Sequence, residues 1–543
     1  MMHFPIAGSG TGPASAAAPL LRAGKTLLLS ALAGATLLLH GCASLPPPLK
    51  REPTLAIPAS QNETLGRIAV QSMVGGEQSG FRPLPISTYS MDARLTLARR
   101  AQATLDLQYY LLQNDVTGHK LLREVRDAAL RGVRVRLLVD DLYTAESDDM
   151  LLALAAYPNI EIRLFNPFPV GRSSTTLRWT LSLGDFSRIN HRMHNKMFIA
   201  DGAFAVAGGR NIADEYFFSS KGGNFVDFDM LIAGDAVPRM AAVFDGYWNS
   251  PRVYPFLPFK ETRETPQALR EGFERLTADA IPAYPTPGDK PDLLGYHPVS
   301  ADMQRPPLKL LYGSIDVFAD DPEKVTGRAE RGGDATTVTA RVGKAIANTK
   351  IEIMVGSPYF IPGQLGMDAM RHAREHGVQV NVMTNSLASN DEPFASAAYG
   401  RYRVPMLKMG VNLYETDSSQ LKNDPLIGTA LGNTVGRSHS KLIVIDRHVT
   451  FVGSMNMDFR SSRLNTELGL LIDSPEFAAQ VLSLAERVRS VGSYRLQLSA
   501  DDHLQWVGTK DGVETVHDHE PDVGLGTKLQ LWLVFPFISE GLL

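Results

Sequence analysis

The stretch that decides the fold runs His194-Asn195-Lys196-Met197-Phe198-Ile199-Ala200-Asp201 and continues to Gly208-Gly209-Arg210-Asn211. It has the form H-x-K-x4-D followed by a glycine pair and an asparagine. The form returns at His439-Ser440-Lys441-Leu442-Ile443-Val444-Ile445-Asp446, followed by Gly453-Ser454-Met455-Asn456. Composition predicts roughly 0.02–0.03 chance occurrences of H-x-K-x4-D in such a chain. Two copies therefore indicate an enzyme whose single active site is shared by two copies of one fold.

The spacing within each copy predicts a β-hairpin. His194 and Lys196 are two residues apart, so on a strand their side chains point to the same face. Asp201-Gly202 is a strong two-residue turn, and the return strand brings Gly209 back beside the histidine. Asp201 and Asp446 fall at the far end of each hairpin, so we expect them to be structural.

The paired residues suit phosphoryl chemistry without a metal or another cofactor. Two lysines, two amides and backbone donors form an anion pocket. One neutral histidine can attack phosphorus, while the other gives a proton to the leaving oxygen. Asp227 and Glu467 occupy matching positions before apolar strands, and we expect Asp227 to orient the ring of His194. The expected catalytic residues are His194, Lys196, His439, Lys441, Asp227 and Glu467, and the expected phosphate-binding residues are Asn211, Asn456, Gly209 and Ser454.

Helical and strand-like segments alternate along both halves of the chain, which is typical of an α/β fold. We expect residues 1–42 to be a signal peptide, 43–85 a flexible tether and 86–255 the first lobe. Residues 256–310 read as a connector or partly structured insert, and 311–500 as the second lobe. Residues 501–543 read as a polar loop and an apolar tail, which either lies in a membrane interface or packs as a terminal strand.

The N-terminal sequence predicts export and lipid anchoring. Arg22 and Lys25 precede an apolar run that is too short for a comfortable membrane span. The run ends at Leu39-His40-Gly41-Cys42, which resembles the lipobox of bacterial lipoproteins, and Cys42 is the only cysteine of the chain. An uncleaved anchor or an overlong start is the alternative. The residue after Cys42 is not Asp, which by this resemblance favours the outer over the inner membrane.

The net charge and the remaining polar clusters indicate which classes of function are favoured. The net charge is −4 and the pI is near 6.4, so no global basic field attracts nucleic acid. His517, His519 and Glu520 lie close together, but a solvated polar loop is the simpler interpretation than a metal site. Arg172, Arg178, Arg188 and Arg192 precede the first motif, where they either meet anionic head groups or form a solvated face.

The doubled motif resembles the phospholipase D superfamily over about residues 90–495. Within it the chain looks most like bacterial cardiolipin synthases, in particular the C type. The similar stretches are residues 106–110, 134–141, 165–168, 192–196 and 208–212, and 357–362 resembles a loop of the wider synthase group. The resemblance implies two α/β/α sandwich lobes related by a pseudo-two-fold axis, with the active site at their interface. It also implies a phosphohistidine on His194, His439 as the acid, and phosphate binding by Lys196, Lys441 and both asparagines.

The function that this resemblance implies is a membrane-anchored phosphatidyltransferase. It would form cardiolipin from phosphatidylglycerol and a second phospholipid such as phosphatidylethanolamine, as a monomer with an internal duplication. One alternative is a phospholipase D that hydrolyses phospholipid, with a nuclease less favoured. Another is a lipoprotein that binds anionic lipid without catalysis, although degenerate motifs would then be expected and both motifs are intact.

Overall fold

A computed structural model describes residues 45, 47, 51–74, 78–172, 174–280, 287–327, 336–421, 436–510, 513–524 and 526. The predicted signal peptide, Cys42 and the apolar tail from residue 529 lie outside these residues. Within them, no helix combines the length and apolar character that crossing a bilayer requires.

The N-terminal lobe alternates strands and helices as the sequence predicts. Its main elements are α3 (Ser87–Arg100), β2 (Thr104–Tyr109), α4 (Val116–Leu130), β3 (Arg134–Asp140), α5 (Asp148–Ala155), β4 (Ile160–Phe165), β5 (Met197–Ala200), β6 (Phe204–Gly208), β8 (Asp229–Gly234) and α8 (Ala236–Trp248). Strands β2, β3 and β4 are parallel, whereas β5, β6 and β8 form an antiparallel meander beside β2. The predicted hairpin is therefore the centre of a mixed sheet.

The C-terminal lobe repeats this order. Its main elements are β10 (Leu311–Ala319), α11 (Val338–Ala347), β11 (Glu352–Gly356), α12 (Gly363–Glu375), β12 (Gln379–Asn385), α13 (Pro393–Gly400), α14 (Arg403–Lys408), β13 (Asn412–Thr416), β15 (Leu442–Ile445), β16 (Val449–Gly453), β17 (Leu468–Asp473) and α17 (Pro475–Val491). Strands β11, β12 and β13 are parallel, and the β15–β16–β17 meander is antiparallel beside β11. The expected duplicated α/β fold is confirmed.

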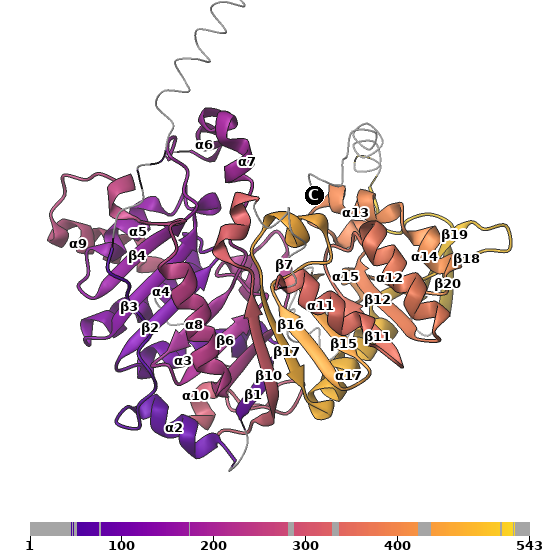
Figure 1. Cartoon of the computed structure of the whole chain (residues 1–543), viewed down its shortest axis with the longest axis horizontal. Helices are drawn as coiled ribbons and strands as arrows, with labels where there is room; N and C mark the ends of the chain where they lie inside the picture. Colours follow the sequence, from indigo (N-terminus) through magenta and orange to yellow (C-terminus); the bar gives the residue numbers. More distant parts are fainter. Residues whose placement is uncertain are drawn as a thin grey trace, which may run out of the picture.

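The two lobes join into one continuous sheet. Strand β1 (Ser79–Leu84) pairs with β8 on one side and β10 on the other, and β10 pairs with β17. Helices cover the sheet in both halves, with the N-terminal lobe in purple and the C-terminal lobe in orange and yellow in Figure 1. A core at the junction includes Phe81 and Phe228 from the first lobe, both in ring contact with Phe477 of the second. This shared core fixes the relative position of the lobes.

Two expectations about the chain's ends are wrong for the described residues. The predicted tether contains α2 (Thr64–Ser72) and the fully buried strand β1. Because β1 is covered on both faces and includes Gly80 and Pro83, it lacks the alternation that reveals a strand. The predicted polar loop contains β19 (Leu504–Lys510) and β20 (Val513–His517), which pair with each other, while β19 also pairs with β18 (Ser493–Leu498).

The predicted connector is a structured insert. It contains α9 (Pro266–Leu276) and the single turn α10 (Val299–Asp302). Thr265 caps the first turn of α9, because its side-chain oxygen accepts a hydrogen bond from the amide of Ala268. Phe273 is buried against Tyr157 of the first lobe. The segment therefore packs on the N-terminal lobe and does not hang free between the lobes.

Candidate active site

The first motif histidine lies at a backbone contact between the lobes. His194 precedes β5, and Met193 forms an isolated parallel bridge with Thr466 of the C-terminal lobe. The amide of His194 donates to the carbonyl of Thr466 at 2.9 Å, and the amide of Thr466 donates to Arg192. This bridge brings Glu467, the residue after Thr466, beside the ring of His194.

The second motif histidine has the mirror arrangement. Strand β14 (Gly436–Ser438) precedes it and pairs in parallel with β7 (Asn224–Val226) of the N-terminal lobe. The amide of His439 donates to the carbonyl of Val226 at 2.8 Å. Asp227, the next residue, is thereby placed beside the ring of His439.

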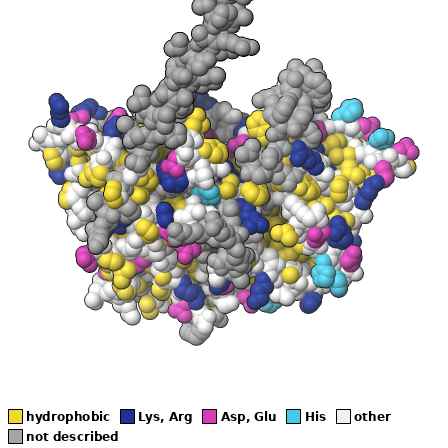
Figure 2. Space-filling model, turned by 45° about the horizontal axis from the view of Figure 1, so that its top comes forward, with side chains coloured by type: hydrophobic (Ala, Val, Ile, Leu, Met, Phe, Trp, Pro, Cys, Tyr) yellow, Lys and Arg dark blue, Asp and Glu magenta, His cyan; other side chains and the backbone are white. Residues whose placement is uncertain are grey.

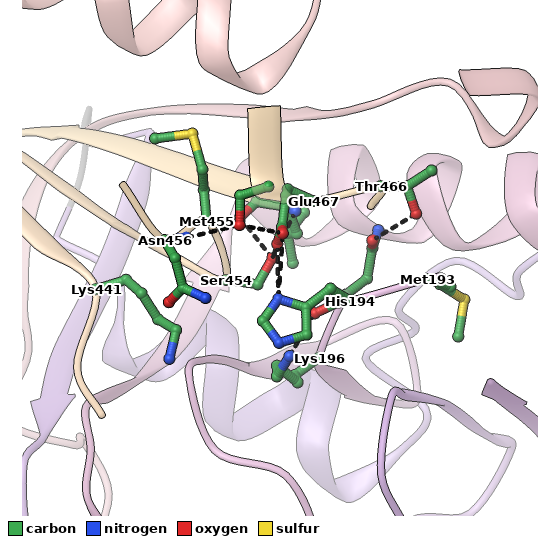
Figure 3. Close-up of polar contacts among 12 residues, drawn as sticks. Met193, His194, Lys196, Lys441, Ser454, Met455, Asn456, Thr466 and Glu467 are labelled. Atoms are coloured by element: carbon green, nitrogen blue, oxygen red, sulfur yellow. Dashed lines mark hydrogen bonds and ion pairs between the residues drawn. The ribbon is translucent and has the colours of Figure 1, made fainter. Parts of the chain in front are cut away.

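Each orienting carboxylate therefore comes from the opposite lobe. The Nδ1 atom of His194 lies 3.0 and 3.2 Å from the two carboxylate oxygens of Glu467, as Figure 3 shows. The Nδ1 atom of His439 lies 2.6 Å from Asp227. The prediction that Asp227 orients His194 is wrong, because the inter-lobe strand pairing exchanges the two carboxylates.

Glu467 is held by an extensive set of donors. The hydroxyl of Ser454 donates to one carboxylate oxygen, and Ser461 donates to the other at 2.8 Å. The backbone amide of Glu467 donates to Asp320 at 3.0 Å. Burial favours the neutral acid, but the charges and hydrogen bonds of His194 and its neighbours outweigh it and hold the pKa of Glu467 at about 2. Glu467 is therefore an ionised carboxylate, which accepts hydrogen bonds but cannot donate them. Its contact with the ring of His194 fixes the ring hydrogen on Nδ1.

Burial controls the protonation of the histidines. Desolvation, with Lys196 and Lys441 nearby, lowers the pKa of His194 to about 4 against the opposing charge of Glu467. Burial and Lys441 also lower the pKa of His439. With Nδ1 facing a carboxylate in each ring, Nε2 is the ring atom left for the substrate, and in His439 this atom also lies 3.1 Å from the Nζ atom of Lys441. Around neutral pH the Nε2 atom of His194 carries a free lone pair, as a nucleophile requires.

The two motif lysines lie in the same buried space. The Nζ atom of Lys196 donates to the carbonyl of His194 at 2.6 Å, and that of Lys441 donates to the carbonyl of His439 at 2.5 Å. Burial lowers the pKa of Lys441 to about 8 and that of Lys196 well below its usual value. Asp227 and Glu467 act on both lysines and favour their charged form. Charges from both lobes therefore meet in one site.

The two asparagines differ in their hydrogen bonds. Asn211 donates to the hydroxyl of Tyr216 at 2.9 Å and accepts from the amide of Leu111 at 3.3 Å. The side-chain oxygen of Asn456 is buried and has no partner within the described structure. Figure 3 shows Asn456 beside Lys441 and the Glu467–His194 pair. Of the two asparagines, Asn456 is therefore the one whose side-chain oxygen can still accept a hydrogen bond from a ligand.

The sequence predicts that Gly209 and Ser454 bind phosphate, but neither residue is positioned to do so. The amide of Gly209 donates to the carbonyl of Phe228, and that of Ser454 donates to Leu468, so both are used by the sheet. An added Cβ at Gly209 would lie 2.1 Å from the Oδ1 atom of Asp227. The glycine is needed because the carboxylate occupies that space, and the serine hydroxyl instead supports Glu467.

The two motif aspartates lie at the hairpin turns, where the sequence pattern puts them. Both adopt a left-handed backbone conformation. The carboxylate of Asp201 accepts hydrogen bonds from the amides of Gln102, Ala103 and Thr104. The carboxylate of Asp446 does the same for residues 350–352. Each therefore holds the start of the neighbouring strand, far from the histidines.

Aromatic rings surround both histidines and were not predicted as site residues. The ring of Tyr110 meets that of His194 edge-on at 4.9 Å, and Tyr216 meets His439 at 5.2 Å. Phe225 lies 5.0 Å and Tyr359 lies 6.5 Å from the ring of His439. Tyr110 and Tyr359 belong to stretches that resemble the family, so that likeness was the available signal.

Of the four arginines before the first motif, three are neither head-group ligands nor a solvated face, and the fourth, Arg188, is partly exposed and pairs with Asp185. Arg172 and Arg178 form ion pairs with the buried Asp141 and Asp148. Arg192 is fully buried and bonds to Asp140. These side chains stabilise the loops that carry the first motif.

The C-terminal polar cluster is divided between a strand and an ion pair. His517 belongs to β20, and Glu520 pairs with Arg403 at 2.5 Å. Within the described ranges, no three His, Cys, Asp or Glu side chains gather in a way that could hold a metal ion. No metal ligand set can therefore be named from these residues.

Comparison with known proteins places the chain in a family. Residues 95–248 and 342–489 match a family described as "Cardiolipin synthase, PLD-like domain". Cardiolipin synthase C of Escherichia coli is 33% identical over 476 residues, which cover 86% of this chain and 96% of that protein. A cardiolipin synthase of Staphylococcus aureus is 27% identical over 420 residues, covering 76% of this chain and 68% of the relative.

A solved structure shows the same fold. It is the phosphatidylserine synthase of Haemophilus influenzae, with a TM-score of 0.55, 15% identity, and coverage of 90% of this chain and 96% of that one. At this identity the likeness concerns the fold alone. It agrees with a fold of two phospholipase D-like lobes.

Proposed function

Because this chain belongs to the phospholipase D superfamily, in the family of cardiolipin synthase PLD-like domains, we propose that it transfers phosphatidyl groups and forms cardiolipin. The acceptor is phosphatidylglycerol, whose head group carries free hydroxyls, and the phosphatidyl donor is a second phospholipid, either phosphatidylglycerol or phosphatidylethanolamine. The observation that carries the proposal is the crossed pair of carboxylate–histidine contacts, His194–Glu467 and His439–Asp227, around two buried lysines. This arrangement supplies a nucleophile, an acid and a cationic pocket without a metal.

In the first step, the Nε2 atom of His194 attacks the phosphorus of the donor phosphodiester. The new N–P bond replaces the bond to the head-group oxygen, which leaves with a proton from His439. Glu467 stabilises the positive charge that develops on the attacking ring, since it accepts the Nδ1 hydrogen. Lys196 and Lys441 neutralise the charge on the non-bridging oxygens.

In the second step, a hydroxyl of the acceptor lipid attacks the phosphatidyl-histidine. His439, now neutral, takes the hydroxyl proton, and the N–P bond breaks to restore His194. Asp227 stabilises the protonated ring of His439 through the 2.6 Å contact. Attack by water at this stage would give phosphatidic acid, so the acceptor determines whether the outcome is transfer or hydrolysis.

The site suits a lipid phosphodiester better than a nucleic acid. On the face shown in Figure 2, Lys and Arg side chains are interspersed with Asp and Glu. A nucleic-acid groove would present a continuous basic stripe to the phosphate backbone. The net charge of −4 fits the same interpretation.

We further propose that the protein works at the bacterial cell envelope. Lipidation of Cys42 would anchor it with several acyl chains, which holds a protein far more firmly than one chain. The sequence around Cys42 favours a periplasm-facing position, and the outer membrane slightly over the inner. Replacement Cys42→Ser should release the protein from membranes in a fractionation experiment, unless the apolar C-terminal tail also binds lipid.

The function is tested by adding the purified full chain to vesicles of phosphatidylglycerol and phosphatidylethanolamine in the presence of a chelator. Mass spectrometry of the lipids should show cardiolipin, and His194→Ala should abolish it. Replacement of the exposed His503 by alanine is the matched control and should leave the rate unchanged. Phosphatidic acid as the sole product would indicate a hydrolase, and bound but unchanged lipid would indicate a binding protein.

A further inference from the structure

A cavity of about 720 Å³ lies between α11 and α12 of the C-terminal lobe, over strands β11 and β12. Its walls are mostly apolar and include Val342, Ile346, Val355, Met370 and Val382. At the rim, Leu365 is 79% exposed, which is unusual for a large apolar side chain. The cavity is therefore an open groove with an apolar floor.

The groove adjoins the candidate active site. Met455 and Asn456, which follow β16 in the second motif, line the end of the groove next to this site. Asp458, Arg463 and Lys324 are its charged lining residues, and Lys324 bonds to Asp320 and to the carbonyl of Ser461 near Glu467. The polar end of the groove thus meets the catalytic machinery, while the apolar part extends between the helices.

The internal duplication allows the helices that line the groove to be compared with their counterparts in the first lobe. Asp201 and Asp446 accept hydrogen bonds from equivalent amides, so residues 102–104 correspond to residues 350–352. The helices are one residue out of step with the strands, because α3 ends at Arg100 and α11 at Ala347, so the buried Leu95 of α3 corresponds to the buried Val342 of α11. Met91 corresponds in the same way to the buried Val338.

The second helix of each lobe shows a replacement of a buried residue by glycine. The helix–strand junctions Gly132-Val133 and Gly377-Val378 are equivalent, and both glycines adopt positive φ. By this alignment the fully buried Leu121 of α4 corresponds to Gly366 of α12. A leucine that fills the core of the first lobe is therefore a glycine in the second, where the groove lies.

Gly343 faces open space. A Cβ built on it would meet no atom within 4 Å, and its helical backbone conformation suits any residue. Glycine is among the least favourable residues inside a helix. Gly343 lines the groove, so a larger side chain at this position would enter the space that a ligand could occupy.

We propose that the groove between α11 and α12 binds one acyl chain of a phospholipid substrate, an inference that rests on the proposed function. A volume of 720 Å³ falls in the range of small-molecule sites, about 300–1,000 Å³. Continuity with Asn456 lets a chain enter the groove while its phosphodiester lies between the histidines. The apolar walls match a hydrocarbon chain, and the charged lining residues lie where the phosphate and glycerol would be.

The test compares substrates that differ only in chain length. Release of the head group from dihexanoyl- and dioleoyl-phosphatidylglycerol is measured in mixed micelles with Gly343→Leu and with Ala369→Leu, which fills the groove from the α12 side. Each buried methylene contributes about 4-fold to binding. Displacement of two or more methylenes should therefore lower kcat/KM for the dioleoyl substrate by about 10-fold or more, with little change for the dihexanoyl substrate.

Gly246→Leu is the matched control, because Gly246 is also an exposed helical glycine whose Cβ would meet nothing within 4 Å. It should leave the ratio of the two substrates unchanged. Retained dihexanoyl activity shows that the groove variants fold. Unchanged dioleoyl activity, or an equal loss for both substrates, would overturn the proposal.

A binding experiment separates this proposal from the proposed function. Fluorescence of cis-parinaric acid, a free fatty acid without a phosphodiester, is titrated with the His194→Ala protein. Binding that Gly343→Leu weakens and Gly246→Leu does not would support the groove even if no cardiolipin were formed. Binding unaffected by Gly343→Leu would overturn the groove even if the vesicle assay gave cardiolipin.

Discussion

Because Glu467 contacts His194 and Asp227 contacts His439, each replacement should affect a different step. We predict that Glu467→Gln impairs attack by His194 and that Asp227→Asn impairs proton donation by His439. Glu467 fixes the hydrogen of His194 on Nδ1 through contacts of 3.0 and 3.2 Å. Loss of a hydrogen bond to a charged group is worth about 1.5–3 kcal/mol, or about 10–150-fold in rate. An amide can also donate to Nδ1 and impose the wrong tautomer, which costs about 10⁴-fold in a Ser-His-Asp triad. We therefore expect a loss of about 10²–10⁴-fold.

The assay uses a phosphatidyl ester of p-nitrophenol, whose leaving group needs no proton. Its burst of p-nitrophenol reports attack by His194 alone. Glu467→Gln should slow this burst by about 10²–10⁴-fold, whereas Asp227→Asn should slow it less than about 10-fold. With phosphatidylglycerol, Asp227→Asn should lower the rate by about 10²-fold or more, because general acid catalysis contributes about 10²–10⁴-fold.

The matched control is Glu264→Gln, which removes an exposed carboxylate and should not alter either rate. The comparison is decisive because an uncrossed arrangement predicts the opposite outcome. A burst lost in Asp227→Asn and retained in Glu467→Gln would refute the exchange of carboxylates between the lobes.

Three further predictions follow from single features. The pKa of His194 is about 4 and that of His439 lies below its usual value of about 6.5. Therefore the dependence of kcat/KM for phosphatidylglycerol on pH should be bell-shaped, with one limb near pH 4 set by His194 and both limbs below about 6.5, and a flat profile from pH 4 to 8 would contradict this. Gly209→Ala would place a methyl group 2.1 Å from Asp227, which orients the acid His439. This change should impair phosphatidylglycerol turnover more than p-nitrophenol release, unlike the control Gly246→Ala. Equal effects on the two reactions would argue against displacement of the Asp227 carboxylate. Asp201→Ala should lower stability by about 3 kcal/mol, at about 1 kcal/mol for each of three amides. Thermal unfolding should show a smaller loss for Asp446→Ala, because two of its three amide partners make exposed hydrogen bonds, and an unchanged midpoint for Asp201→Ala would disprove the role.

The sequence predicted the features that are local. The spacing of His194 and Lys196, the Asp201-Gly202 turn and the apolar return strand predict a hairpin, and the structure has it as β5 and β6. The helix–Gly–Val–strand junctions predict the parallel strands β3 and β12. Because these signals depend on neighbours within a few residues, they are readable from one sequence.

The features that were missed depend on contacts between distant residues. Asp227 and Glu467 could be recognised as equivalents, but the histidine that each one meets follows from pairing between the lobes. The use of the Gly209 amide by Phe228 also follows from the sheet register. Strand β1 was not predicted, because its sequence resembles a proline-containing linker. The strands with which it pairs are about 150 and 230 residues away.

The most direct test of the account is to identify the residue that carries the phosphatidyl group. The His439→Ala protein is mixed with phosphatidyl-p-nitrophenol, quenched rapidly and digested under conditions that preserve phosphohistidine. Because this leaving group needs no proton and resolution of the intermediate needs His439, the adduct should accumulate, and peptide mapping should place it on His194. An adduct on another residue of this protein, or cardiolipin synthesis by His194→Ala, would contradict the account.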